Sequence, residues 1–201
     1  MSEHYYSAKP TVGHEIHTFE EKLRGQTFIF QTDAGVFSKK GIDFGSRLLI
    51  ETMEISSGHQ VLDVGCGYGP IGLCAAVLAK PGMVTLLDVN ERALGLAKEN
   101  AGRNGIGNVT VMQSDALAGV AGRKFDRILT NPPIRAGKEV VHRIFEQAAE
   151  ALTPGGQLWV VIQKKQGAPS AFAKLEQLFD GHVAEMSKEK GYRIFRAEKL
   201  T

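Results

Sequence analysis

The sequence predicts an α/β protein with a Rossmann-like, doubly wound and mostly parallel seven-stranded sheet, a C-terminal antiparallel strand and a short N-terminal extension. From about residue 60 onward, apolar segments of strand length alternate with segments of helical periodicity, which is typical of right-handed βαβ units. A glycine-rich turn follows the first apolar segment, where sheets of this class bind ligands. The 201 residues, 43% of them hydrophobic, are enough for one such domain.

The expected elements can be placed in order along the chain. Short apolar runs bounded by turn residues predict strands, and apolar residues at helical spacing predict helices. The strands fall at 61–64, 84–89, 109–115, 126–131 and 157–163, and the helices at 71–80, 91–101, 138–152 and 171–179. Asn90 is a suitable N-cap for the second helix, and Pro81-Gly82 ends the first. Residues 182–199 are expected to form two more strands, joined by a turn at Lys190-Gly191.

The first 58 residues differ from this pattern. They predict short strands followed by a helix that begins near Ser46. A segment of this size is too short to bury a core of its own. We therefore expect residues 1–58 to be an extension packed on a core of residues 59–201, within a single structural unit.

Composition and charge exclude several classes of protein. The formal net charge of +2 gives little support for nucleic-acid binding, although a local basic patch is compatible with a neutral total. Cys66 and Cys74 are spaced for neither a metal site nor a disulfide framework. The segment His14–His17 is one residue short of the zinc motif H-E-x-x-H. With no signal-like or membrane-spanning apolar run, we expect a cytoplasmic protein with no metal and no membrane partner.

The turn after the first strand, LDVGCGYGPIG at 62–72, contains two overlapping patterns. Residues 67–72 fit the dinucleotide fingerprint G-x-G-x-x-G, which is a weak signal alone. Residues 63–69 fit D-x-G-x-G-x-G, the loop that holds S-adenosylmethionine. The strand leads directly into Gly65, so the dinucleotide pattern begins two residues late. A carboxylate at Asp63 would also repel a pyrophosphate, whereas it attracts a methionine ammonium. The sequence therefore favours S-adenosylmethionine.

Asp88 ends the second strand, nineteen residues after Gly69. A carboxylate at this place can accept both hydroxyl protons of a ribose. S-adenosylmethionine and the nicotinamide dinucleotides both contain such a ribose. Asp88 therefore indicates a ligand with an adenosine ribose but does not distinguish between these cofactors.

The turn Asn131-Pro132-Pro133-Ile134 closes the fourth strand. A residue before proline is extended and neither proline has an N–H, so the turn is stiff and presents acceptors. The Asn131 side-chain oxygen and the Pro132 carbonyl could each accept one proton of an exocyclic amino group. The turn thus predicts methyl transfer to an amino nitrogen.

Together these motifs resemble the class I S-adenosylmethionine-dependent methyltransferases of the small-domain superfamily. Within it, the chain most resembles the short single-domain branch of the ribosomal RNA small-subunit (16S) guanine-N2 methyltransferases. The resemblance runs through HYYS, GVFSKKGIDFGS, LDVGCGYGPIG, LLDVN, QSD, NPPIRAGK and VVIQKKQGA. It implies an RNA substrate, ribosomal RNA or a ribosomal subunit, and a monomer or weak homodimer.

The resemblance also implies roles for individual residues. The residues expected to bind the cofactor are Asp63, Gly65, Gly67 and Gly69 at the methionine part, Asp88 at the ribose, Val89, Asp115 and Ala116 at the adenine, and Asn131. The catalytic turn would be Asn131, Pro132, Pro133 and Ile134, where many amino methyltransferases place an aromatic residue instead of Ile134. The residues expected to contact the substrate are Phe37, Ser38, Asp43, Ser46, Arg135 and Lys138.

Three other functions remain open from the sequence. A protein amide nitrogen is a second acceptor that sites of the Asn-Pro-Pro type methylate. If the dinucleotide fingerprint is the operative motif, the chain is a nicotinamide-dependent dehydrogenase. A non-catalytic module that only binds the cofactor is the third, and the intact Asn131-Pro132-Pro133 turn argues against it.

Overall fold

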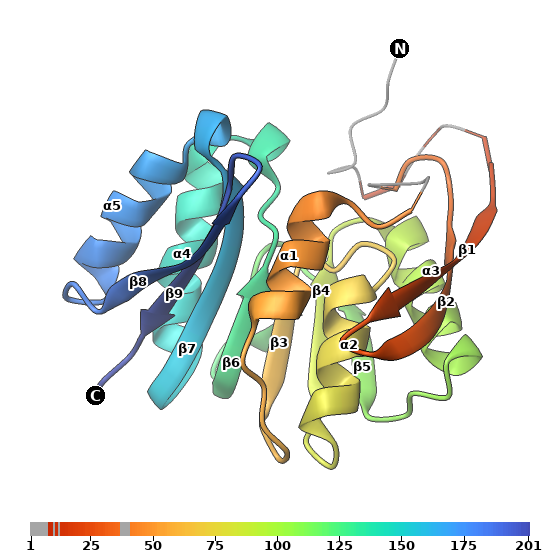
Figure 1. Cartoon of the computed structure of the whole chain (residues 1–201), viewed down its shortest axis with the longest axis horizontal. Helices are drawn as coiled ribbons and strands as arrows, with labels where there is room; N and C mark the ends of the chain where they lie inside the picture. The colour runs from red at the N-terminus through yellow and green to blue at the C-terminus, as the bar shows by residue number, and fades with distance from the viewer. Residues whose placement is uncertain (1–7, 10, 12, 37–40) are drawn as a thin grey trace.

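A computed structural model describes residues 8–9, 11, 13–36 and 41–201, and its centre is a seven-stranded sheet (Figure 1). The strand order is β5-β4-β3-β6-β7-β9-β8. Five strands run parallel, namely β3 (Val61–Val64), β4 (Val84–Asp88), β5 (Val109–Gln113), β6 (Phe125–Thr130) and β7 (Leu152–Gln163). The C-terminal β9 (Tyr192–Glu198) pairs antiparallel with both β7 and β8 (Val183–Glu189). This order confirms the predicted mostly parallel sheet with an antiparallel C-terminal strand.

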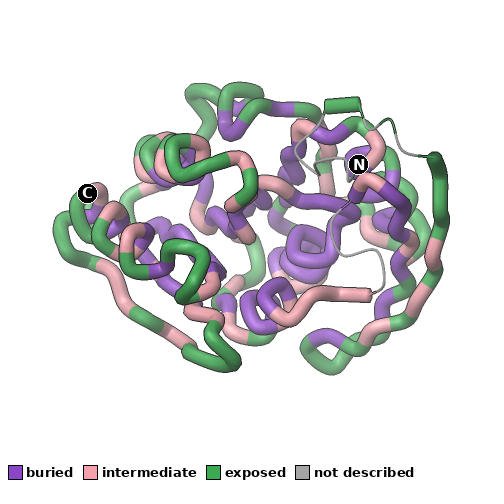
Figure 2. Tube along the Cα trace, turned by 90° about the horizontal axis from the view of Figure 1, so that it is seen from above, coloured by how far each residue is buried: buried purple, intermediate pink, exposed green. Residues whose placement is uncertain are grey.

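Helices cover both faces of the sheet. On one face lie α1 (Phe44–Thr52), α2 (Pro70–Ala79) and α3 (Glu91–Arg103), and on the other lie α4 (Lys138–Ala151) and α5 (Ala168–Leu178). Alternate side chains of β7 point to opposite faces of the sheet. Trp159 packs in the apolar cluster of α1–α3, whereas Leu158 and Val160 pack in that of α4 and α5. Figure 2 shows the buried residues gathered in the middle of the molecule. The doubly wound arrangement is therefore confirmed.

Several elements begin earlier than the sequence pattern suggested. Helix α1 begins at Phe44 because Asp43 caps it, with Asp43 Oδ2 accepting from the Ser46 N–H at 3.0 Å. Helix α5 begins at Ala168, directly after Gly167, which has a φ of +102°. The predicted cap of α3 is confirmed, since Asn90 accepts from the Ala93 N–H at 3.0 Å.

The N-terminal extension forms a separate two-stranded hairpin, β1 (His17–Leu23) and β2 (Gln26–Thr32). Asn100 of α3 binds its backbone twice, accepting from the Gln31 N–H and donating to the Gln31 carbonyl. Leu23, Phe28 and Phe30 are buried in the same apolar cluster as α1–α3. The division at residue 58 stays a prediction. Within the described part of the chain, no helix is both long and apolar enough to cross a membrane.

Candidate active site

A pocket lies at the carboxyl ends of β3, β4 and β6, which meet at the top of Figure 1. It has about 350 Å³ of empty space, part of it open to solvent. This is the point where the strand order reverses, since β4 and β6 flank β3 on opposite sides. The residues that line it are Val64, Gly65, Leu87, Asp88, Val89, Ser114, Ala116, Asn131, Pro133 and Ile144.

The glycine loop is held against β4 by a network of backbone hydrogen bonds. Gly65, Gly67 and Gly69 have φ values of +75°, +57° and +108°, which side chains rarely adopt. The N–H groups of Gly65 and Cys66 both donate to the Leu87 carbonyl at 2.8 Å. Gly67 N–H donates to Asp88 Oδ2, also at 2.8 Å. The loop is thereby fixed with bare backbone close to the pocket.

Asp88 is buried and holds two segments at once. Its Oδ2 accepts from the Gly67 N–H, and its Oδ1 accepts from the Asn90 N–H at 2.9 Å. Asp88 also lines the pocket, and a carboxylate can accept a hydrogen bond from a ligand hydroxyl. The predicted ribose contact at Asp88 is thus compatible with a second, structural role that the sequence did not indicate.

Asp63, on β3 next to the pocket-lining Val64, is fully buried and is not itself a lining residue. Its Oδ2 accepts from the Gly72 N–H at 2.8 Å, whereas no described residue donates to its Oδ1. Burial raises the pKa of Asp63 to about 7; the Asp88 charge adds to this effect and the Gly72 N–H opposes it. A cationic or hydrogen-bonding group that reached Oδ1 would favour the charged form. Gly72 permits this packing, because a Cβ there would lie 2.7 Å from Leu86 Cγ.

The Asn131 side chain is oriented by the start of α1. Its Nδ2 donates to Ser46 Oγ at 3.1 Å and to Asp43 Oδ2 at 3.3 Å. An ionised carboxylate only accepts hydrogen bonds, so Asp43 selects the NH2 end of the amide. Asn131 lines the pocket, and this orientation leaves its Oδ1 as the available acceptor. Three residues predicted for the site are therefore brought together: Asp43, Ser46 and Asn131.

The rest of the turn Asn131–Ile134, which was predicted to be catalytic, is held by a backbone hydrogen bond. The Pro132 carbonyl accepts from the Ile134 N–H at 2.9 Å, and Pro133 lines the pocket. Ile134 is half-buried and packs against the apolar cluster of α4 and α5. It is not among the pocket-lining residues, so contact between Ile134 and a base stays a prediction.

The loop after β5 closes the far side of the pocket. Val89 and Ala116, both predicted at the adenine, line it. Ser114 was not predicted; its Oγ donates to the Ala116 carbonyl at 2.8 Å and accepts from the Gly119 N–H at 2.9 Å. Its position at the carboxyl end of a strand is the signal that could have found it. Asp115 has a side chain 63% exposed that pairs with Arg143 at 2.8 Å, outside the pocket lining. An adenine contact from Asp115 stays a prediction.

Arg135 and Lys138, also predicted to contact the substrate, are not among the residues that line the pocket. Arg135 and Lys138 are exposed and follow the catalytic turn. Phe37 and Ser38 fall outside the described residues. Among the residues that the structure describes, no three His, Cys, Asp or Glu side chains are grouped as a metal site requires.

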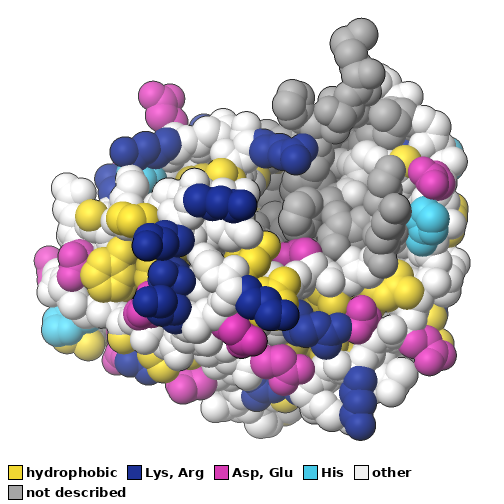
Figure 3. Space-filling model, turned by 45° about the horizontal axis from the view of Figure 1, so that its top comes forward, with side chains coloured by type: hydrophobic (Ala, Val, Ile, Leu, Met, Phe, Trp, Pro, Cys, Tyr) yellow, Lys and Arg dark blue, Asp and Glu magenta, His cyan; other side chains and the backbone are white. Residues whose placement is uncertain are grey.

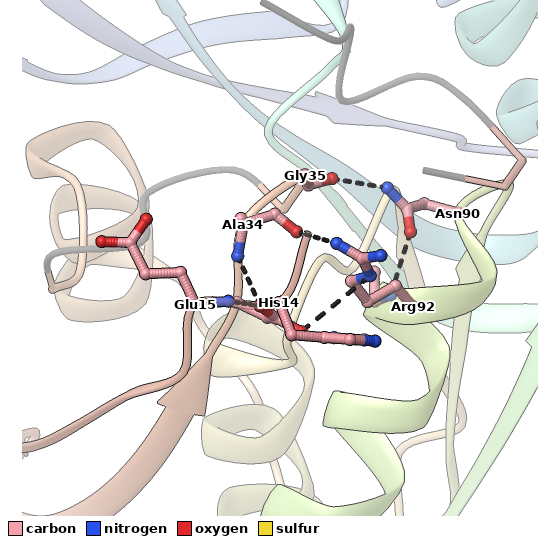
Figure 4. Close-up of polar contacts among 8 residues, drawn as sticks. His14, Glu15, Ala34, Gly35, Asn90 and Arg92 are labelled. Atoms are coloured by element: carbon pink, nitrogen blue, oxygen red, sulfur yellow. Dashed lines mark hydrogen bonds and ion pairs between the residues drawn. The ribbon is translucent and has the colours of Figure 1, made fainter. Parts of the chain in front are cut away.

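A polar cluster ties the extension to the pocket (Figure 4). Asn90, whose N–H donates to Asp88, also donates through Nδ2 to the Gly35 carbonyl at 2.8 Å. Arg92 Nη1 donates to the Ala34 carbonyl at 2.6 Å. The buried Asp33 completes the cluster by accepting from the N–H of Glu15 at 2.6 Å and pairing with His14 at the same distance. Residues 33–35 are thus fixed to the start of α3.

Residues 27–196 match the family model described as "Methyltransferase small domain". The chain belongs to the methyltransferase small-domain family. It is 56% identical, over the full length of both chains, to the uncharacterized protein YbxB of Bacillus subtilis. It is 35% identical to the ribosomal RNA large subunit methyltransferase G of Pseudomonas aeruginosa, over 83% of this chain and 45% of that protein.

Among solved structures, a 16S rRNA N2 methyltransferase of T. thermophilus, in complex with AdoMet and guanosine, superposes with a TM-score of 0.82. The two are 27% identical, and the match covers 94% of this chain and 52% of the other. The chain therefore spans about half the length of the named ribosomal RNA methyltransferases that it matches. These findings confirm the family that the motifs resembled, and AdoMet in the T. thermophilus complex is the cofactor that the glycine loop predicted.

Proposed function

We propose that this chain transfers a methyl group from S-adenosylmethionine to an exocyclic amino group of RNA, namely N2 of a guanine in ribosomal RNA. One observation supports this most directly. The amide of Asn131 is turned by Asp43 and Ser46 so that its oxygen is the acceptor left for the pocket. An acceptor at the end of β6 is what an amino substrate needs.

The residues around the pocket fit the cofactor. Gly65 brings bare backbone to the pocket, the Asp88 carboxylate lines it where ribose hydroxyls are expected, and Val89 and Ala116 form an apolar wall for the adenine. The buried Oδ1 of Asp63, to which no described residue donates, is the acceptor that we expect for the ammonium group. When bound, S-adenosylmethionine supplies an electrophilic methyl group.

Two oxygens would bind the amino group of the substrate. Asn131 Oδ1 and the Pro132 carbonyl would each accept one proton of the amino group; the Pro132 oxygen already accepts from Ile134 and has a second lone pair. Accepting these protons returns electron density to a nitrogen whose lone pair is delocalised into the ring. The two oxygens would accelerate methyl transfer mainly by positioning the amino group and by their preorganised dipoles. A base within a helix would first have to leave its stack.

The choice of RNA follows from the relatives. The named relatives act on ribosomal RNA, and the T. thermophilus enzyme was solved with guanosine. The test is transfer of labelled methyl groups to ribosomal RNA isolated from cells that lack this protein, followed by mapping of the modified nucleotide. We expect label in N2-methylguanosine, and labelling ~100-fold slower or more with Asn131→Ala. Label that appears only in protein, or on another atom of RNA, would reject the proposal.

A further inference from the structure

Three lysines stand at the carboxyl edge of the sheet, beside the candidate active site. Lys164 and Lys165 belong to the turn after β7, and Lys190 to the hairpin turn between β8 and β9. The two turns are joined, since the Lys164 N–H donates to the Gly191 carbonyl at 2.8 Å. We call these three residues the lysine rim. All three are exposed, and no described carboxylate forms an ion pair with any of them.

The lysine rim is connected to the catalytic turn through α1. Lys190 Nζ lies 4.7 Å from the centroid of the Phe44 ring, which also packs on Tyr192. Phe44 is the first residue of α1, directly after Asp43, whose carboxylate holds Asn131. A cation over an aromatic face is attracted by the ring, so this contact fixes the ammonium group near the pocket.

Positively charged side chains gather at the carboxyl edge of the sheet, on the side of the lysine rim. Figure 3 shows Lys and Arg side chains gathered on the left half of the face that carries the carboxyl edge, over the β7–β9 side of the sheet. Arg135 and Lys138 add two exposed cations after the catalytic turn. The whole chain carries a net charge of only +2, so this grouping is local rather than a property of the overall composition.

We propose that the lysine rim binds backbone phosphates of the RNA substrate while the target base enters the pocket. This inference rests on the proposed function and adds how the substrate is held. Lysine is a point charge on a flexible stem, suited to phosphates of any sequence rather than to one base edge. A polymer with one charge per nucleotide can reach Lys164, Lys165 and Lys190 at once, whereas a free nucleoside in the pocket carries no such charge.

The test compares two double variants of the full chain with the same change in net charge. Lys164→Gln with Lys190→Gln removes two cations from the lysine rim. Lys80→Gln with Lys98→Gln removes two exposed cations elsewhere, at the end of α2 and on α3. Binding of ribosomal RNA is measured at several salt concentrations, together with methylation at saturating RNA, cofactor affinity and melting temperature.

We expect the rim variant to lower the slope of log Kd against log salt by about 1.4 to 1.8, at ~0.7–0.9 for each of the two lost phosphate contacts. Its KM for RNA rises, whereas its kcat at saturating RNA and its cofactor affinity match wild type. Lys164→Arg with Lys190→Arg, which keeps both charges, restores the slope. The Lys80 and Lys98 variant keeps the wild-type slope.

Two results would overturn the inference and are distinct from failure of the proposed function. In the first, wild type methylates RNA, but the salt slope and KM of the rim variant equal those of the Lys80 and Lys98 variant. This result rejects phosphate binding by the lysine rim and leaves the proposed function intact. A wild type that methylates protein and not RNA rejects both, and impaired protein methylation in the rim variant would then assign these lysines to an acidic protein partner.

Discussion

Asn131 Nδ2 lies 3.3 Å from Asp43 Oδ2, although 88 positions separate the two residues in the sequence. The contact joins the first residue after β6 to the N-cap of α1. An amide can present either its oxygen or its NH2 group, and a neighbour that only accepts, such as a carboxylate, selects the NH2 group. The N-terminal extension therefore sets the direction of the one side-chain amide that the catalytic turn supplies.

Replacing Asp43 by Asn should reduce turnover while α1 is retained. Asparagine caps helices as well as aspartate does, but its amide can donate or accept, so it no longer selects one orientation of Asn131. We expect kcat to fall about tenfold, as for loss of a hydrogen bond to a charged group, with little change in cofactor affinity. Single-turnover methylation at saturating cofactor and RNA measures this. An unchanged rate in the folded variant would limit Asp43 to helix capping.

Asn131→Ala should affect turnover most. It removes the acceptor at the amino group, where charge develops as the new bond forms, so we expect kcat to fall ~100-fold or more. Ser46→Ala is a useful comparison, because it removes one of the two acceptors for Nδ2 and leaves the Asn131 oxygen in place. Thermal unfolding controls for misfolding. If folded Asn131→Ala turns over like wild type, the residue only shapes the turn.

Asp88→Ala should weaken cofactor binding more than it slows methyl transfer at saturation. The carboxylate would meet the ribose equally in the bound and reacting states, so its loss is uniform binding. It also holds the N–H groups of Gly67 and Asn90, and the glycine loop loses its anchor with it. We expect a loss of ~1.5–3 kcal/mol or more in binding free energy, measured by calorimetry. An unaltered dissociation constant would contradict both roles.

Asp63 should make the free energy of unfolding depend on pH. In the unfolded chain its pKa is near 3.8, whereas burial raises it to about 7 in the folded protein. Between these values the folded state binds more protons, so the contribution of Asp63 to stability falls as pH rises from about 4 to about 7 and is constant above. Denaturant unfolding of wild type and Asp63→Asn from pH 5 to 8 isolates this contribution. A difference between the two proteins that does not change with pH would show that the side chain is already ionised at pH 5.

Local patterns in the sequence were sufficient for most of the fold. The strands at 61–64 and 84–89 were predicted within one residue, because apolar runs bounded by turn residues are decided by nearby sequence. Glycines after a strand likewise indicated the position of the pocket. The C-terminal hairpin was predicted at Lys190-Gly191, where both residues adopt positive φ.

Contacts between distant segments could not be predicted in this way. Nothing near Asp43 in the sequence indicates that it meets Asn131, since the contact depends on how α1 packs over the sheet. The sequence does not indicate either in which direction a side chain points after the end of a strand. Ala116 has a φ of +49°, and the Asp115 side chain beside it pairs with Arg143 at the surface.

Asn90 connects the Asp88 carboxylate directly to the N-terminal segment. Its N–H donates to the Asp88 carboxylate, and its side-chain amide donates to the Gly35 carbonyl. The conformations of Asp88 and of the backbone at Gly35 are therefore energetically coupled through Asn90. Thermodynamic reciprocity then applies: an occupant of the pocket that favours this arrangement of Asp88 favours that of Gly35 by the same factor, and the reverse. The cofactor and the N-terminal extension are in this sense effectors of one another.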